Sequence, residues 1–387
     1  MNGWNIEKLA TLVNVVYGKS PSAIEKLDDG FPIFGTGGVV GYTSEVLYEG
    51  PSVILGRKGT IDKVQRCTSP FWAIDTTYYT TPKRDFDWSW LYYTISSFDL
   101  RKLNEASGVP SLSRSSLEAL DVAVPPLHEQ QKIAAILTTV DKKLDVIARQ
   151  IEATKTLKQG LVQTLFRRGV GTQNTDGRWV PHTEFKDSEQ GQIPAMWEVV
   201  PQGMVSTFFN GRAYKLTEWE ETGTSVIRLQ NLTGSGDKYY YSNLTLPEHQ
   251  YVNNGDLLYM WSASFGPYIW SGEKAIYHYH IWKVECGERL DRLFMYYSLD
   301  WLTTGMKGKT HGSTMMHLTK AGMEKYPMVL PPLAEQRQIA KILSTVDSKI
   351  ELLTARQTQF MNLKRGLMQK LLTGEWRVRL DGSASET

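Results

Sequence analysis

Two segments of the chain carry apolar residues every three to four positions, separated by Lys, Gln, Glu, Thr and Arg. They lie within residues 125–170 and 331–375. A period near 3.5 residues over several heptads predicts long helices that pair along an apolar seam, as in a coiled coil. The predicted seam positions are Ile133, Leu137, Val140, Leu144, Ile147, Ile151, Leu157, Leu161 and Leu165, then Ile339, Leu343, Val346, Ile350, Leu353, Phe360, Leu367 and Leu371. A helix buried inside an ordinary domain is the alternative.

Both predicted helices contain residues that weaken the seam. The polar residues Thr154, Gln357 and Lys364 interrupt it, and polar seam positions tend to set the register of paired helices. Gly160 and Gly366 occupy equivalent positions, and each costs about 1 kcal/mol of helix propensity relative to alanine. They indicate either a close approach of two backbones or a tolerated local weakness.

The two helical segments belong to an internal repeat. The motif Pro125–Gln130 recurs as Pro331–Gln336, an offset of 206 residues. Of the 41 positions from Pro125 to Leu165, 19 are identical in the second copy. A weaker repeat precedes it: a segment from Trp4 to Gly18-Lys19 resembles one from Trp197 to Gly211-Arg212, with an offset of 193. The chain therefore reads as two diverged copies of one unit, each a globular domain followed by a long helix.

The globular segments are rich in glycine and tyrosine. Their short β-like runs are Ser52–Leu55, Trp72–Thr80, Ser225–Leu229 and Ile276–Val284, and their helical patches are Trp88–Leu100 and Leu290–Trp301. This mixture predicts the α/β class, with two mixed α/β domains separated by two long helices. The predicted boundaries are a first domain at 1–124, a helix at 125–170, a polar linker at 171–195, a second domain at 196–330, a helix at 331–375 and a tail at 376–387, disordered from 382.

Composition narrows the possible classes of protein. The chain has 387 residues with 43 Lys and Arg against 41 Asp and Glu, a net charge of +2, which argues against a uniformly cationic nucleic-acid binder. Aromatic residues make up 11%. Cys67 and Cys286 cannot form a disulfide framework, and no apolar run approaches the roughly 20 residues of a membrane span. We expect a cytoplasmic protein without a signal peptide.

Catalytic signatures are missing from the sequence. Gly35-Thr36-Gly37-Gly38 lacks the Gly-Lys-Ser/Thr of a phosphate-binding loop, and neither Pro-Pro pair forms the Asn/Asp-Pro-Pro-Tyr of an amino-methyltransferase. His278 and His280 alternate on a predicted strand and could share a metal, but without further ligands nearby they are expected to pack instead. The sequence therefore predicts a chain that is not an enzyme by itself and holds no metal.

The repeated helix motif carries a resemblance to a known family. Pro-Pro-Leu-x-Glu-Gln, followed by Ile-Ala, Ile-Leu and Val-Asp, resembles the conserved regions of the specificity subunits of type I restriction-modification systems. Trp197-Glu198-Val199 after Gly191–Pro194 resembles the usual start of that family's second recognition domain. Gly255–Leu258 resembles its recurrent Gly-Asp-Ile-Leu strand. The resemblance covers nearly the whole chain.

The resemblance implies two target recognition domains held apart by an antiparallel coiled coil, with pseudo-twofold symmetry. It implies reading of a bipartite, asymmetric site in double-stranded DNA, one half per domain, with the helices measuring the spacer. Two modification (methyltransferase) subunits would dock on the helices, and restriction/translocase subunits would complete the complex. This chain would bind no cofactor, because S-adenosylmethionine, ATP and Mg2+ would belong to the partner subunits.

Such domains must present Lys and Arg to phosphates and a few polar side chains to base edges. The candidates in the first copy are Arg57, Lys58, Thr60, Lys63, Arg66, Ser111, Ser113 and Arg114. Those in the second are Arg212, Lys215, Arg228, Gln230, Asn231, Ser262, Ser264, Lys307, Lys309, His311 and Lys320. Base stacking is a weaker expectation for Tyr78, Tyr79, Tyr239, Tyr240 and Tyr241, because core packing occupies most aromatic residues.

Two other functions fit the same sequence. One is the recognition subunit of a type IIB-like restriction-modification enzyme, which cuts on both sides of its site and differs in the partner. The other is a coiled-coil scaffold that presents two protein-binding domains and never touches DNA. Salt separates the scaffold from the DNA readers, because binding to phosphates weakens steeply as salt rises.

Overall fold

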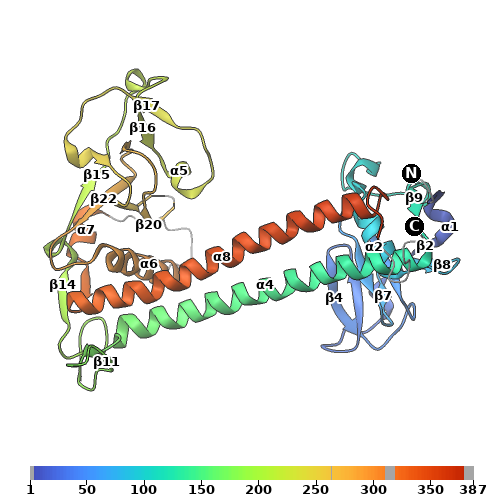
Figure 1. Cartoon of the computed structure of the whole chain (residues 1–387), viewed down its shortest axis with the longest axis horizontal. Coiled ribbons are helices and arrows are strands. Elements are labelled where there is room, and N and C mark those ends of the chain that lie inside the picture. Colours follow the sequence, from blue (N-terminus) through green and yellow to red (C-terminus); the bar gives the residue numbers. More distant parts are fainter. Residues whose placement is uncertain (1–3, 263, 310–318, 379–387) are drawn as a thin grey trace, which may run out of the picture. The chain divides into compact units, whose positions relative to one another are not determined.

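The structure, a computed structural model, describes residues 4–262, 264–309 and 319–378, without the side chains of residues 23 and 307–309. It divides into two compact units, each made of a globular domain and portions of both long helices (Figure 1). Unit 1 comprises residues 1–150 and 353–387, and unit 2 comprises residues 151–352. Among the described residues, no helix is both long enough and apolar enough to cross a membrane.

Unit 1 contains a four-stranded antiparallel sheet, a three-stranded sheet and a two-stranded ribbon. Its strands are β1 (Asn5–Lys8), β2 (Val13–Tyr17), β3 (Phe31–Gly35), β4 (Gly38–Thr43), β5 (Ser52–Gly56), β6 (Gln65–Cys67), β7 (Trp72–Ala73), β8 (Thr77–Pro82) and β9 (Asp121–Val124). Its helices are α1 (Leu9–Leu12), α2 (Trp88–Ser96), α3 (Arg114–Glu118) and the 3-10 turns η1 (Pro21–Ala23) and η2 (Leu100–Leu103).

Unit 2 contains two four-stranded sheets, a two-stranded ribbon and two short hairpins. Its strands are β10 (Thr172–Gln173), β11 (Trp179–Val180), β12 (Phe185–Lys186), β13 (Ile193–Pro194), β14 (Glu198–Pro201), β15 (Ser206–Asn210), β16 (Thr224–Ile227), β17 (Tyr240–Ser242), β18 (Tyr251–Val252), β19 (Leu257–Met260), β20 (Gly266–Ile269), β21 (Ala275–Tyr277), β22 (Ile281–Cys286) and β23 (Pro327–Leu330). Its helices are α5 (Leu229–Thr233), α6 (Arg292–Lys309), α7 (Lys320–Lys325) and the 3-10 turns η3 (Gln202–Met204), η4 (Leu216–Glu218) and η5 (Glu248–Gln250).

The two units share most of their topology, with β18 added to the second sheet of unit 2. The sheet order β2-β8-β5-β6 in unit 1 matches β15-β22-β19-β20 in unit 2, and the ribbon β1-β9 matches β14-β23. The parallel pair β3 and β7 matches the parallel pair β16 and β21. The repeat seen in the sequence is therefore a repeat of the fold, and the mixed α/β class is confirmed.

Several predicted elements end elsewhere than expected. The predicted runs Trp72–Thr80 and Ile276–Val284 are each two strands, interrupted by turns at residues 74–76 and 278–280. The run Ser225–Leu229 ends at Ile227, because the Asn231 side chain accepts a hydrogen bond from the Arg228 amide at 2.9 Å and starts helix α5. The region predicted as a linker contains two short hairpins, β10-β11 and β12-β13.

Both helical patches form helices, and the start of the first was predicted correctly. Helix α2 begins after Asp87, whose carboxylate accepts the amide of Trp90 at 2.8 Å, and it ends at Ser96 rather than at Leu100. Helix α6 begins after Asp291, whose carboxylate accepts the amide of Phe294 at 3.0 Å, so its start is later than predicted and it continues to Lys309. A carboxylate at the N-cap satisfies amides that have no partner inside the helix.

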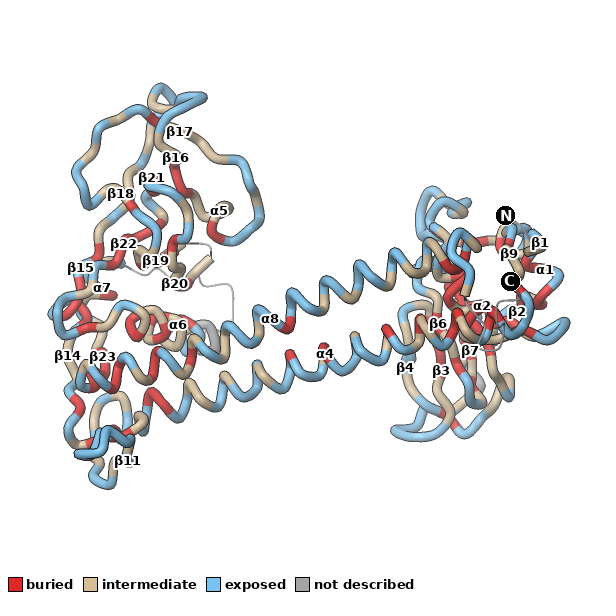
Figure 2. The backbone as a smooth tube through the Cα atoms, in the orientation of Figure 1, coloured by how far each residue is buried: buried red, intermediate tan, exposed pale blue. Residues whose placement is uncertain are grey.

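The two long helices are α4 (Leu127–Arg168) and α8 (Leu333–Leu371). They run antiparallel within each unit: in unit 1 the core joins Ile133 and Leu137, near the start of α4, to Leu371 at the end of α8. Figure 2 shows that the buried residues of both helices concentrate toward the helix ends, where the helices run along the globular domains, with a few buried residues between them. One seam position was predicted wrongly, because Leu157 is 55% exposed.

Lysine replaces leucine in that part of the seam. The ammonium of Lys158 lies 2.7 Å from Asp347 in unit 2, and the ammonium of Lys364 lies 2.6 Å from Asp141 in unit 1. Each aspartate also accepts a tyrosine hydroxyl from its domain, Tyr297 at 2.8 Å and Tyr93 at 2.7 Å. Lys158 lies 17 residues after Asp141, and Asp347 lies 17 residues before Lys364, so both bridges mark the same antiparallel register.

The glycines of the long helices are weak points rather than contact points. A Cβ atom built at Gly160 or Gly366 would meet no atom within 4 Å. We therefore expect Gly160→Ala and Gly366→Ala each to raise the free energy of unfolding by about 0.5–1 kcal/mol in urea titrations. Gly177 is the matched control: it also faces open space, but its φ of +75° should make Gly177→Ala destabilising. A loss of stability in either helix variant would contradict this interpretation.

Candidate DNA interface

Three loops of unit 1 meet at one end of its sheets. They are the turn between β3 and β4, the loop that follows β5, and the loop that precedes α3. Lys63 donates to the carbonyl of Gly37, the Gly59 amide donates to Pro110 at 2.9 Å, and Lys58 forms a β-bridge with Ser111. These contacts gather Lys58, Thr60, Lys63 and Ser111, with the first three exposed. A cluster of cations and hydroxyls on joined loops suits a phosphate backbone.

Arg57 lies beside this cluster and is held by the turn that joins β7 to β8. Its Nε atom donates to the carbonyl of Asp75 at 2.9 Å, and its guanidinium lies 5.7 Å from the ring centroid of Tyr17. The Nε bond orients the guanidinium and leaves both terminal nitrogens without a hydrogen-bond partner among the described residues. Those nitrogens have the geometry that binds guanine or phosphate.

Three other candidates of unit 1 have structural contacts. Arg66 lies on β6, where it donates to Ser89 and lies 5.4 Å from the ring of Tyr92 in α2. Ser113 caps α3, and its hydroxyl accepts the amide of Ser116 at 3.1 Å. Arg114 is exposed and pairs with Glu118 at 2.7 Å. The structure thus does not bring Arg66 to the loop cluster, and the Ser113 hydroxyl is already used as the N-cap of α3.

Unit 2 builds the same end of its domain with different side chains. Ser262 and Ser264 follow β19, in the place that Lys58 and Thr60 take after β5. Arg212 follows β15, and its guanidinium pairs with Glu218 at 2.7 Å. Hydrogen bonding to Glu218 raises the pKa of Arg212, which keeps this group charged.

The segment from Arg228 to Lys238 forms a small cationic loop. The guanidinium of Arg228 and the ammonium of Lys238 lie 5.1 Å and 5.4 Å from the ring centroid of Tyr240. The Asn231 amide donates to the carbonyl of Lys238 at 3.1 Å, so Asn231 holds the loop closed. Gln230 lies in α5 and is half-buried.

The remaining candidates of unit 2 are less informative. Lys215 is exposed and donates only its backbone amide, to Glu218 at 2.8 Å. Lys320 lies in α7 and pairs with Glu324 at 3.5 Å. His311 and the side chains of Lys307 and Lys309 lie outside the described residues, as does the tail from residue 382.

The tyrosines separate into core and surface residues. Tyr78 and Tyr79 are 2% and 9% exposed and lie in the cores of unit 1, so they cannot stack on a base. Burial raises the pKa of Tyr78 to about 12. Tyr239, Tyr240 and Tyr241 are half-buried. Among the predicted stacking residues, only these three have surface that DNA could reach.

His278 and His280 do not alternate on a strand, as the sequence had indicated, but lie in the turn between β21 and β22. Their ring centroids are 5.2 Å apart. Burial lowers the pKa of His278 to about 4, and burial also lowers that of His280, so both imidazoles are neutral at pH 7. No group of three or more metal-ligand side chains exists among the described residues.

Sequence reasoning missed four residues of these loops. Tyr17 and Asp75 contact Arg57 in unit 1, and Trp261 and Tyr279 contact each other in unit 2. Asp75 and Tyr279 are equivalent turn residues, and Arg57 and Trp261 follow equivalent strands. No single residue type marks these positions, and only the offset of 204 residues between the copies relates Arg57 to Trp261 and Asp75 to Tyr279.

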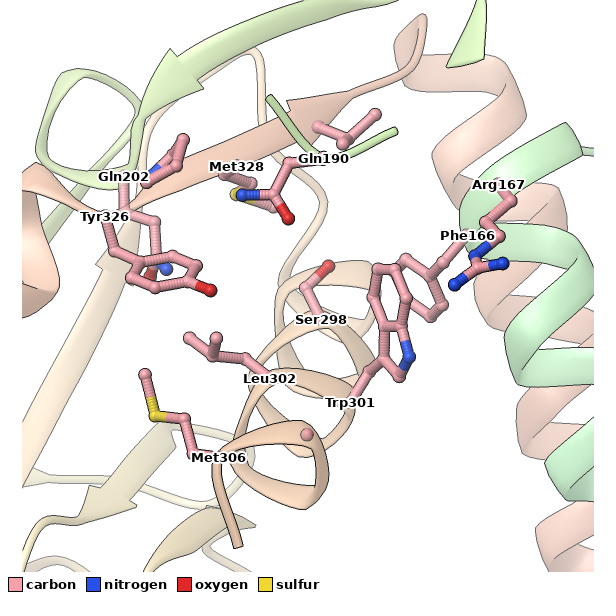
Figure 3. Close-up of a pocket in the computed structure, with 13 residues that line it drawn as sticks. Phe166, Arg167, Gln190, Gln202, Ser298, Trp301, Leu302, Met306, Tyr326 and Met328 are labelled. Atoms are coloured by element: carbon pink, nitrogen blue, oxygen red, sulfur yellow. The ribbon is translucent and has the colours of Figure 1, made fainter. Parts of the chain in front are cut away.

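A cavity of about 300 Å³ opens elsewhere in unit 2, between the end of α4, α6 and β23 (Figure 3). Its lining includes Phe166, Arg167, Trp301, Tyr326 and Met328. The Oε1 atom of Gln202 and the Oγ atom of Ser298 are buried without partners among the described residues. In unit 1 the equivalent residues Phe98, Leu120 and Val122 pack into the core. In unit 2, Phe166 and Met328 likewise belong to the core and Trp301 packs against it, so the cavity lies at the edge of that core.

Comparison with known proteins agrees with the duplicated architecture. Residues 1–155 and 194–360 match the family described as type I restriction modification DNA specificity domain. The type I restriction enzyme MjaVIII specificity subunit of Methanocaldococcus jannaschii is 24% identical, over 97% of this chain and 93% of that protein. The putative MjaX specificity subunit of the same organism is 29% identical, over 75% of this chain and 68% of that protein.

Solved structures share the fold. The type I restriction-modification S subunit from M. genitalium superposes with a TM-score of 0.63 at 15% identity, over 96% of both chains. A chain from a structure of type I restriction-modification complex assembly gives 0.59 at 14% identity, over 97% of this chain and 99% of that one. Because the family match covers both globular domains and most of both long helices, the chain belongs to the type I restriction modification DNA specificity family.

Proposed function

We propose that this chain is the DNA specificity subunit of a type I restriction-modification complex and is not itself catalytic. Its domains at 1–124 and 196–330 each read one half of a bipartite, asymmetric site in double-stranded DNA. The helical segments at 125–170 and 331–375 set the spacer between the halves. Two modification subunits and the restriction subunits supply methyl transfer, translocation and cleavage.

The main support for the proposal is a contact repeated in both units with different side chains: the residue after β5 or β19 is hydrogen-bonded to the turn between β7 and β8 or between β21 and β22. Unit 1 places Arg57 and Lys58 there, and unit 2 places Trp261 and Ser262 in the equivalent positions. A duplicated frame with changed tips is what two recognition specificities in one chain require. The named relatives, which are specificity subunits of type I restriction enzymes, support the same function.

Exchange of one domain tests this function. The full chain, in complex with its modification subunits, should methylate a split sequence in a randomised DNA library. Replacing residues 1–124 with the matching domain of a relative should change one half of that sequence and leave the other half intact. Changes in both halves, or in neither, would rule out one domain for each half.

The scaffold alternative is separated by salt. We expect the affinity of the complex for its DNA to fall steeply between about 50 and 200 mM salt, because phosphate contacts release counterions. The control is the modification subunits without this chain, which should show no preferred split sequence. Salt-independent binding, or an equal preference without the chain, would favour the scaffold.

A further inference from the structure

The turns between β7 and β8 and between β21 and β22 are held by the same backbone contacts in the two units. The Gly18 amide donates to Thr77 at 3.0 Å, and the Gly211 amide donates to Ile281 at 3.0 Å. The amides of Thr77 and Ile281 in turn donate across their turns, to Ile74 at 2.9 Å and to His278 at 3.0 Å. The turn backbones are therefore fixed alike.

Two glycines enforce this close packing. A Cβ atom on Gly18 would lie 2.0 Å from the carbonyl oxygen of Ile74, and one on Gly211 would lie 2.2 Å from that of His278. Neither site has room for a side chain, because a backbone oxygen cannot move aside cheaply. Each turn is thus pressed against the end of the first strand of its four-stranded sheet, β2 or β15.

A side-chain contact is also repeated, although the side chain differs. In unit 1 the Arg57 Nε atom donates to the carbonyl of Asp75 at 2.9 Å. In unit 2 the Trp261 Nε1 atom donates to the carbonyl of Tyr279 at 2.8 Å. The backbone amides of Arg57 and Trp261 donate to the next turn residue, Thr76 at 2.8 Å and His280 at 3.2 Å. An arginine and a tryptophan thereby present different chemistry from one position.

The side chains of the two turns differ in chemical type. Unit 1 presents the exposed side chain of Asp75, whose backbone carbonyl accepts the hydrogen bond from Arg57. Unit 2 presents a cluster of rings: Tyr279 lies 3.9 Å from His280, and His280 lies 5.6 Å from Trp261 between centroids. Tyr279 is 39% exposed. Variation confined to the tips of a fixed frame indicates contact with something that differs between the two units.

We propose that these two turns are base-reading elements and that their side chains determine one position in each half-site. This inference rests on the proposed function and names residues within it. Asp75 and Arg57 suit a G·C pair, because carboxylates accept from cytosine N4 and guanidinium groups bind guanine. The rings of Tyr279 and His280 suit a pair with an apolar edge, the thymine methyl group.

The test uses the full chain in complex with its modification subunits, with methylated sequences read from a randomised library. Asp75→Asn should change the base preference at one position of the first half by at least about fivefold. His280→Ala and Tyr279→Ala should do the same in the other half only. Glu49→Gln is the control, because Glu49 is exposed at the opposite end of β5, and it should leave both halves unchanged.

The outcomes separate this inference from the proposed function. A wild-type complex with no preferred split sequence would overturn both. A specific wild-type complex whose preference survives all three turn variants would overturn only the turns. Thermal unfolding of each variant checks that it is folded. His280→Gln, which keeps a hydrogen-bond donor and an acceptor, is a second variant at this position. It should also change the base preference at one position, and an unchanged preference would count against the inference.

Discussion

Glu335→Ala is expected to lower the free energy of unfolding by about 3–5 kcal/mol, a large fraction of the stability of a domain. The Glu335 side chain is 2% exposed and accepts hydrogen bonds at 2.7–3.0 Å. The donors are the amides of Val170 and Gly171, the His182 ring and the Trp197 indole. Removing the carboxylate leaves these donors buried without an acceptor, each at a cost of about 1–3 kcal/mol.

Urea unfolding followed by tryptophan fluorescence measures this loss, since Trp197 is buried beside the carboxylate. Glu152→Ala is the matched control on the other long helix, because the Glu152 side chain is 72% exposed and should matter by less than about 0.5 kcal/mol. Glu335→Gln, which keeps one oxygen acceptor, should lie between the two. A loss below about 1 kcal/mol in Glu335→Ala would mean that the donors find water instead.

Removing residues 144–150 from α4 together with residues 355–361 from α8 is expected to shorten the spacer of the DNA site by about 3 base pairs. Seven helical residues rise about 10 Å, and one base pair rises about 3.4 Å. The two segments are opposite each other in the register defined by the Asp141–Lys364 and Lys158–Asp347 bridges, so both bridges survive the paired deletion. The prediction rests on the proposed function of the helices.

The library assay described for domain exchange reads out the spacer. Both half-sites should stay the same, because the deletions leave the loops at 57–63 and 261–264 untouched. Asp145→Ala with Arg149→Ala is the control, because these residues form an exposed pair within the deleted segment, and the spacer should not change. Deleting only one of the two segments should destroy specific methylation, since the register is lost. An unchanged spacer after the paired deletion would remove the measuring function from the helices.

The helices and the repeat were predictable because period and offset are properties of the sequence alone. The exposure of Leu157 was not, because an α-helix has 3.6 residues per turn and drifts from a strict heptad. Lys158, rather than Leu157, faces the partner helix, where its ammonium group pairs with Asp347. Such a pairing depends on two residues far apart in the chain, and the spacing within one helix does not reveal it.

The repeated motif Pro-Pro-Leu-x-Glu-Gln was the clearest signal in the sequence, yet its structural role was invisible there. Glu335 is nearly inaccessible, whereas glutamate is usually solvated. Gln130 and Gln336 accept the amides of Asp87 and Asp291, at 2.9 Å and 2.8 Å, and so fix the start of a domain helix in each unit. The motif joins domain to helix, and burial that depends on tertiary contacts cannot be read from residue type.

Part of the candidate DNA interface could be predicted from the sequence. The loop at 57–63 was predicted from its cations, but its partners at Gly37, Asp75 and Ser111 come from segments joined only by the sheets. The predicted strands across residues 74–76 and 278–280 concealed two turns, because neither turn contains the glycine or proline that would mark it in the sequence. Only the folded chain shows that these turns lie beside the predicted loops.

The discontinuity of unit 1 has a consequence for the order of events on the ribosome. Its core includes Leu371 and Leu372, and its Glu129 receives Arg377, so the unit lacks part of its interior until almost the whole chain has been made. Unit 2 is continuous from residue 151 to 352 and can close earlier. Synthesis proceeds at about 5–20 residues per second, so roughly ten seconds or more pass between the synthesis of Leu137 and that of Leu371. During this time Ile133 and Leu137 are uncovered on the side that α8 will take. Nascent chains of this protein therefore offer an apolar helix to chaperones for longer than a contiguous two-domain chain of the same length would.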